Sequence, residues 1–154
     1  MAFRFSLQAM LRLRRSYEQR ERLQLLTLAS AVARLRTHLE EITSEQQRLF
    51  QNQEESLAAG TSGAELHLLR FAMAQQVEKQ KALQEQIRRV EQQLEVQKLA
   101  YHEAQKNRKI LENLRDRQLE VYEQEQDRRE KQALDDLFNM RRAQRVAGTL
   151  LPGE

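Results

Sequence analysis

The sequence predicts an all-α fold: a long two-helix antiparallel coiled-coil hairpin in which the second helix overhangs the first. The first observation is composition, because 32% of the residues are charged, 5% are aromatic, and there are four Gly and one Pro. Side chains without branching at Cβ, such as those of Gln, Glu, Arg and Leu, lose little rotamer freedom in a helix. The second observation is that apolar residues recur at spacings of three and four, as in a coiled-coil seam. The third is a single Gly-containing break, about which the chain is expected to fold back.

The break lies at residues 58–65, which include Gly60, Ser62 and Gly63. Glycine adopts backbone angles that other residues resist, and a serine followed three residues later by an acid, here Glu65, is a helix N-cap signal. We therefore expect one domain, residues 1–154. Its elements are predicted as a first helix at about 6–58, a turn at about 59–63, a second helix at about 64–146, and a frayed tail at 147–154, which holds Gly148, Pro152 and Gly153.

The apolar stripes of the two predicted helices match each other. Folding about the turn pairs residues whose numbers sum to about 122, so that Leu35 faces Ile87. The predicted seam of the first helix is Leu25, Leu28, Val32, Leu35, Leu39, Ile42, Gln46 and Leu49. That of the second is Leu66, Leu69, Met73, Gln76, Gln80, Leu83, Ile87, Val90, Leu94, Gln97, Tyr101, Ala104, Arg108, Leu111, Arg115, Gln118 and Tyr122.

Toward the chain ends the seam loses its apolar residues. Arg14, Glu18 and Glu21 would fall at seam positions, which predicts a register shift or splaying there. The residues expected to turn inward instead are Tyr17, Ile110 and Leu114. The second helix should overshoot the first by about 30 residues, beginning near Arg117. Its uncovered apolar residues are typical of a partner surface.

Catalytic chemistry is not indicated. His38, His67 and His102 are scattered singly, the Gly60–Gly63 segment lacks the lysine of a phosphate-binding loop, and a two-helix rod offers no concave pocket. We therefore expect no enzyme, cofactor or metal site. The chain has no Cys, no apolar stretch of membrane-spanning length and no secretory signal at its start, so a soluble cytoplasmic protein is expected.

Arginines gather near both ends of the chain, and a hairpin would bring these ends together. They favour an acidic protein partner over nucleic acid, because no aromatic residues are interleaved with them. A nucleic-acid binder and a generic coiled-coil scaffold that dimerises through the overhang stay as alternatives. Phe50 and Phe71 lie off the seam at one level near the turn, where they either close the last seam layers or form an aromatic docking patch.

Two end motifs resemble the flagellar export protein family FliJ. The segment 3–15, Phe-Arg-Phe-Ser-Leu-Gln-Ala-Met-Leu-Arg-Leu-Arg-Arg, is similar to the family's opening F-x-F-x-L and L-x-L-R, with an early acid at Glu18. The segment 130–136, Glu-Lys-Gln-Ala-Leu-Asp-Asp, is similar to its E-x-K-x-x-D-E element, with Asp136 where Glu is usual. Between these ends the resemblance is the coiled-coil pattern, the length and the single turn.

The resemblance implies a non-enzymatic, stalk-like component of the flagellar type III export apparatus, monomeric when free. Its implied partners are the hexameric export ATPase, the export-gate membrane protein and export chaperones, with association at the inner membrane through these partners only. The implied contacts with the ATPase ring are Phe3, Phe5, Leu7, Arg12, Arg14, Arg15, Leu134, Asp135, Asp136, Leu137 and Phe138. Phe50 and Phe71, which no family motif marks, are candidates for the gate contact.

Overall fold

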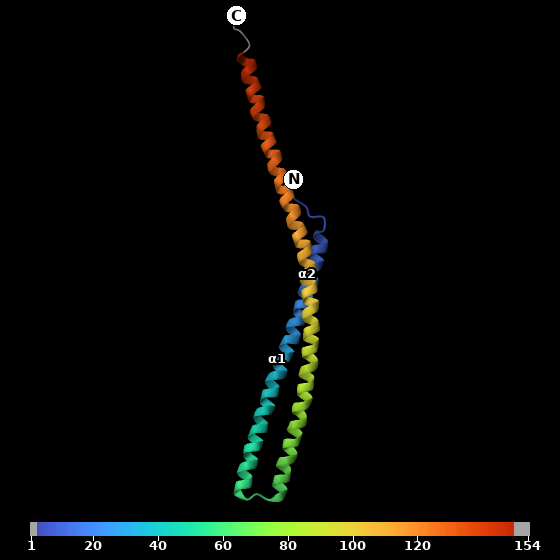
Figure 1. The fold of residues 1–154 in the computed structure, drawn as a ribbon, viewed down its shortest axis with the longest axis vertical. Coiled ribbons are helices and arrows are strands. Elements are labelled where there is room, and N and C mark those ends of the chain that lie inside the picture. Colours follow the sequence, from blue (N-terminus) through green and yellow to red (C-terminus); the bar gives the residue numbers. More distant parts are fainter. Residues whose placement is uncertain (1–2, 150–154) are drawn as a thin grey trace. The chain divides into compact units, whose positions relative to one another are not determined.

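The computed structural model describes residues 3–149, and it confirms the predicted fold class. The described chain consists of two long helices and contains no strand: α1, Gln8–Ala59, and α2, Gly63–Thr149. They run antiparallel on either side of one short turn (Figure 1). By their contacts the residues form two compact units, residues 15–106 and residues 1–14 with 107–154. We call these the hairpin unit and the terminal unit and describe each by itself.

Both helices differ from the prediction by a few residues at their outer ends. α1 begins at Gln8 because the segment before it is not helical, and the first turn is formed by hydrogen bonds from Gln8 N to Phe5 O and from Leu11 N to Leu7 O, at 3.2 and 2.9 Å. α2 continues through Gly148 to Thr149 instead of ending at about 146. A lone glycine costs a helix only about 1 kcal/mol relative to alanine, so it does not have to end one. Residues 150–154 of the predicted tail lie outside the described residues.

The turn has the geometry that its glycine predicts. Gly60 has a φ of 79°, and the amides of Thr61 and Gly60 donate to the carbonyls of Ser56 and Leu57, at 3.2 and 3.4 Å. This pair of bonds is the Schellman arrangement, which satisfies carbonyls left open at a helix end. Ser62 accepts a bond from the amide of Glu65 at 3.5 Å, as the N-cap prediction requires. The chain reverses direction between Ala59 and Gly63 because α1 is capped at its C-terminal end and α2 at its N-terminal end.

In the hairpin unit, the predicted seam and register are confirmed. Ile42, Leu83 and Ile87 form a buried cluster with Leu35 and Leu39 packed against it. Every predicted seam position of α1 is buried or half-buried, and so is every one of α2 except Gln118, which is replaced by Leu119. Polar seam residues are hydrogen-bonded across the helices, as in the bond from Gln46 to Gln80 at 2.9 Å.

The inward turn of Tyr17, Ile110 and Leu114 that was expected near residues 12–24 is wrong. Glu18 and Glu21 stay half-buried at their seam positions, and Gln97 Nε2 donates to the backbone carbonyl and carboxylate of Glu21 at 3.0 and 2.5 Å. Tyr17, Ile110 and Leu114, which were expected to face inward, are exposed. The aliphatic part of a long polar side chain can lie along the seam while its polar end reaches a hydrogen-bond partner or solvent. The seam spacing of three and four residues therefore continues through positions that are not apolar.

The terminal unit packs around Leu11, which is 0% exposed and is the largest fully buried side chain of the described residues. Phe5 is also buried, and the ring of Phe3 lies against that of Tyr122 with centroids 5.6 Å apart. Arg14 and Arg108 are both half-buried in this unit, and Arg108 forms an ion pair with Glu112 one turn along α2.

Candidate partner-binding surfaces

The end of α2 is an exposed single helix. Every residue from Asp127 to Gly148 is exposed, and in Figure 1 this orange-to-red part of α2 continues alone past the N-terminal segment. The overhang therefore begins about ten residues later than predicted, because the extended residues before α1 reach as far as Tyr122.

One side of this overhang carries an apolar stripe. Leu134, Leu137 and Phe138 are 65%, 55% and 70% exposed, and with Asp135 and Arg141 they line a shallow groove. Spacings of three, four and seven residues place Leu134, Leu137, Phe138 and Arg141 on one face of a helix. We call these four residues the overhang stripe. Asp136, which was also expected to contact the ATPase ring, does not line the groove.

The aromatic residues of the N-terminal motif lie elsewhere. Phe5 is buried, and Phe3 and Leu7 are half-buried against the rest of the terminal unit, whereas Arg12 and Arg15 are exposed and Arg14 is half-buried. Tyr122, which Phe3 contacts, lies twelve residues before Leu134, or about 18 Å along a helix. The structure thus does not bring the two groups of predicted ATPase contacts together. Their contact with a partner stays a prediction.

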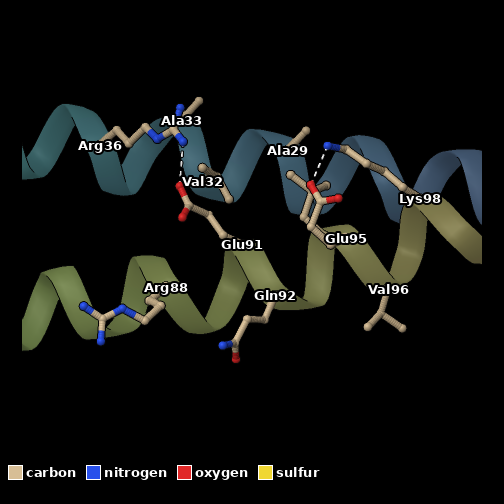
Figure 2. Close-up of a pocket in the computed structure, with 11 residues that line it drawn as sticks. Ala29, Val32, Ala33, Arg36, Arg88, Glu91, Gln92, Glu95, Val96 and Lys98 are labelled. Atoms are coloured by element: carbon tan, nitrogen blue, oxygen red, sulfur yellow. Dashed lines mark hydrogen bonds and ion pairs between the residues drawn. The ribbon is translucent and has the colours of Figure 1, made fainter.

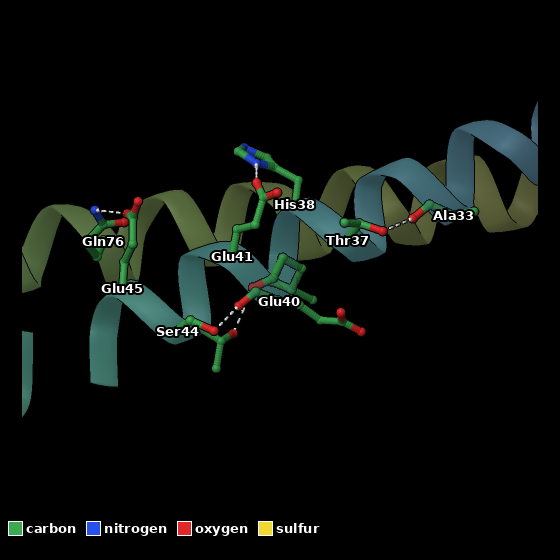
Figure 3. A network of polar contacts seen from close by, with 10 residues as sticks. Ala33, Thr37, His38, Glu40, Glu41, Ser44, Glu45 and Gln76 are labelled. Carbon is green, nitrogen blue, oxygen red and sulfur yellow. Dashed lines mark hydrogen bonds and ion pairs between the residues drawn. The ribbon is translucent and has the colours of Figure 1, made fainter. Parts of the chain in front are cut away.

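The second predicted patch, near the turn, is also open to solvent. Phe50 and Phe71 are 53% and 60% exposed, so about half of each side chain faces solvent. Phe50 lines a groove with Met73, Val77 and four polar residues of α1, and Phe71 is not part of that groove. Beside it, Gln76 donates to Glu45 at 3.0 Å while its Oε1 is buried and has no hydrogen-bond partner (Figure 3). The structure leaves this patch available without bringing its two rings into one groove.

The hairpin unit has a further groove, which the spacing of the seam residues did not predict. A groove of the hairpin unit is lined by Ala29, Val32 and Ala33 of α1 and by Leu94 and Val96 of α2 (Figure 2). The charged residues at its edges are paired within the molecule, as in Arg36 with Glu91 at 2.5 Å and Lys98 with Glu95 at 2.6 Å. The signal in the sequence is the run 23–33, the longest stretch of the chain without a charged residue.

Metal binding and membrane insertion would each require a particular feature of the described residues. Between residues 3 and 149, no three His, Cys, Asp or Glu side chains are grouped so as to hold a metal ion. No helix of this described part is long and apolar enough to cross a membrane. The overhang stripe and the groove of the hairpin unit are exposed apolar surfaces with charged residues at their edges.

Comparison with known proteins gives one match. The family model of the flagellar FliJ protein matches residues 3–148, nearly the whole chain. Searches of curated proteins and of solved structures gave no match. The chain belongs to the FliJ family of flagellar export proteins.

Proposed function

We propose that this member of the FliJ family is a non-enzymatic stalk of the flagellar type III export apparatus that binds the hexameric export ATPase through its overhang. The chain acts in the cytoplasm, at the inner membrane, which it reaches only through its partners. It is monomeric when free.

The observation that carries this proposal is the overhang stripe. A helix of a monomer whose apolar residues face solvent on one side is suited to insertion into an apolar groove or ring of a partner. The residues after the stripe add charge, since Arg142 and Arg145 follow Arg141 with no acidic residue between Leu137 and Gly148. An ATPase surface with an apolar centre and an acidic border would complement both features.

Contacts with the export gate and with export chaperones belong to the same proposal. The exposed rings of Phe50 and Phe71 support a gate contact on the hairpin unit, far in sequence from the overhang stripe. Separate surfaces would let one stalk hold the ATPase and the gate together. No surface of the described chain is specific to chaperones.

The test compares substitutions on two faces of the overhang in the full-length chain. Phe138→Asp and Leu134→Asp place a charge on the stripe, and Asn139→Asp and Gln132→Asp place the same charge on the opposite face. Because all four positions are exposed, the variants should keep the thermal stability of the parent. We expect the stripe variants to weaken binding to the purified export ATPase by about tenfold or more, and the controls to change it little.

Two results would overturn the proposal. Equal ATPase binding by the stripe and control variants would remove the overhang as the site. A stable dimer of the free chain in light scattering, lost in Phe138→Asp, would instead favour the dimerising scaffold.

A further inference from the structure

The outward face of α1 in the hairpin unit carries the uncharged run 23–33. The face is made of three neighbouring columns of the heptad outside the seam, and Leu23, Thr27 and Ala33 also line grooves that α2 shares. They hold Leu23, Ser30 and Thr37, then Leu26 and Ala33, then Arg20, Thr27 and Arg34. We call these eight residues the α1 outer face.

The centre of this face carries exposed apolar side chains. Leu23 and Leu26 are each 55% exposed, although nothing in the described chain covers them. The hydroxyl of Thr27 donates to the carbonyl of Leu23 at 2.9 Å. The hydroxyl of Thr37 donates to the carbonyl of Ala33 at 3.1 Å, as Figure 3 shows. Both threonines thus use their hydroxyl donors within the helix.

This pattern is not general for outward positions of α1. Two heptads further along the same columns lie Glu40, Glu41, Gln47 and Arg48, all exposed, charged or polar. Outward positions on a hairpin are ordinarily of this second kind. An apolar segment of about three turns on that side requires another explanation than the packing of the hairpin.

Arginines stand at both ends of the apolar centre. Arg20 and Arg34 occupy the same heptad column, fourteen residues or about 21 Å apart. Neither forms an ion pair with any described residue, whereas Arg36, two residues beyond Arg34, is bonded to Glu91. Each guanidinium group would form its strongest hydrogen bonds with a carboxylate. A partner that covers the apolar centre would therefore be complementary if it carried carboxylates at both ends.

We infer that the α1 outer face is a docking site for an amphipathic helix of another protein, whose apolar stripe is flanked by acidic residues. The partner helix would be about four turns long, with its apolar side chains on Leu23, Leu26 and Ala33 and its carboxylates at Arg20 and Arg34. This inference goes beyond the proposed ATPase contact, which lies on the terminal unit.

A second copy of this chain is a poorer occupant. Two copies packed antiparallel about Thr27 would set Arg20 of one against Arg34 of the other, and a parallel arrangement would set Arg20 against Arg20. Like charges opposed across an interface are unfavourable. The charge pattern of the face therefore selects an acidic partner over itself.

The experiment uses the full chain and two designed peptides. One is a fluorescein-labelled helix of about 21 residues with leucine at its a and d positions and glutamate beside them, and the other has lysine in place of each glutamate. Fluorescence anisotropy is measured at low and at high salt. We expect the acidic peptide to bind at least about tenfold more tightly than the basic one, with a preference that falls as salt rises.

Variants locate the binding. Leu26→Glu and the double variant Arg20→Gln/Arg34→Gln should each weaken binding of the acidic peptide about tenfold or more. The matched control is Leu99→Glu, which changes a leucine that is 70% exposed on α2 and should leave the affinity unchanged. Circular dichroism of all variants checks that helicity is kept, which the exposure of these positions predicts.

The remaining outcomes overturn the inference. They are failure of the acidic peptide to bind, equal binding of both peptides, and equal loss of binding in Leu99→Glu. Self-association of the chain that Leu26→Glu abolishes would assign the face to a second copy. Binding of the export ATPase by Leu26→Glu reports separately on the proposed function, because a chain that lacks this face should still carry the overhang stripe.

Discussion

The ring of Phe3 lies against the ring of Tyr122, with centroids 5.6 Å apart and planes inclined at 51°. Phe3 precedes α1 and Tyr122 lies within α2, so this contact fastens the extended start of the chain to the second helix. Phe5, two residues on, is buried in the same unit. The aromatic motif at the start of the chain therefore has a structural role, whatever partner contact it also makes.

We expect Phe5→Ala to loosen residues 3–7 from α2, because it removes the buried ring of this segment. The Phe3–Tyr122 pair that remains is worth about 0.5–1.5 kcal/mol beyond its area, and Leu7 is only half-buried. Hydrogen exchange of the amides around Tyr122 should become faster. Met10→Ala is the control, since Met10 is exposed on the first turns of α1. Unchanged exchange in Phe5→Ala would show that the segment is not held by this ring.

Leu11 and Leu13 form a matched pair two residues apart in α1. Leu11 is fully buried and Leu13 is 51% exposed. Leu11→Ala should lower the free energy of unfolding by about 2–5 kcal/mol, and Leu13→Ala by less than about 1 kcal/mol. Urea unfolding followed by circular dichroism measures both, and similar losses would contradict the packing of the terminal unit.

The hydrogen bond between Gln46 and Gln80 predicts opposite effects for single and double replacement. Gln46→Leu alone leaves the amide of Gln80 partly buried without its partner, which costs about 1–3 kcal/mol. Replacing both residues by Leu creates an apolar layer beside Ile42 and should be neutral or stabilising. A double-mutant cycle measured by thermal unfolding checks the coupling, and strictly additive effects would count against the bond.

The two turn glycines should respond differently to alanine. Gly60 has a positive φ, so Gly60→Ala should cost about 1 kcal/mol in strain, although no atom lies within 4 Å of the added Cβ. Gly63 is the first residue of α2 with equally open surroundings, so Gly63→Ala should stabilise the chain by about 0.4–1 kcal/mol. Melting temperatures of the two variants should thus move in opposite directions, and a common direction would refute the assignment.

The fold was predictable because one periodicity and one turn determine it. The seam from Leu25 to Leu49 follows from spacing, and its match to Met73–Gln97 follows from the position of the turn, which selects one register among those that bury both stripes. The prediction failed where charged residues occupy seam positions. Glu21 was expected to leave the seam, but its side chain accepts a bond from Gln97 and remains there. Composition does not reveal a hydrogen bond between residues so distant in sequence.

The candidate sites were predictable only in part. The overhang stripe appears in the sequence because no first-helix residues remain to cover it. The inward packing of Phe3 and Phe5 could not be predicted from the sequence, because residues 3–7 are not helical and have no regular spacing that would indicate a buried face. The α1 outer face was not predicted, because the coiled-coil period identifies only the buried columns of a helix. Its uncharged run, residues 23–33, is nevertheless visible in the sequence.

The capped turn at Gly60 also bears on the order in which the hairpin unit folds. Residues joined across the helices are 34 apart in the chain at Gln46–Gln80 and 76 apart at Glu21–Gln97. Closing the longer loop costs about 0.6–0.7 kcal/mol more chain entropy, since each doubling of loop length adds about 0.6 kcal/mol. Contacts near the turn should therefore form first, and the helices should zip toward the chain ends. Ile42→Val would then slow folding, whereas Gln97→Ala would mainly speed unfolding.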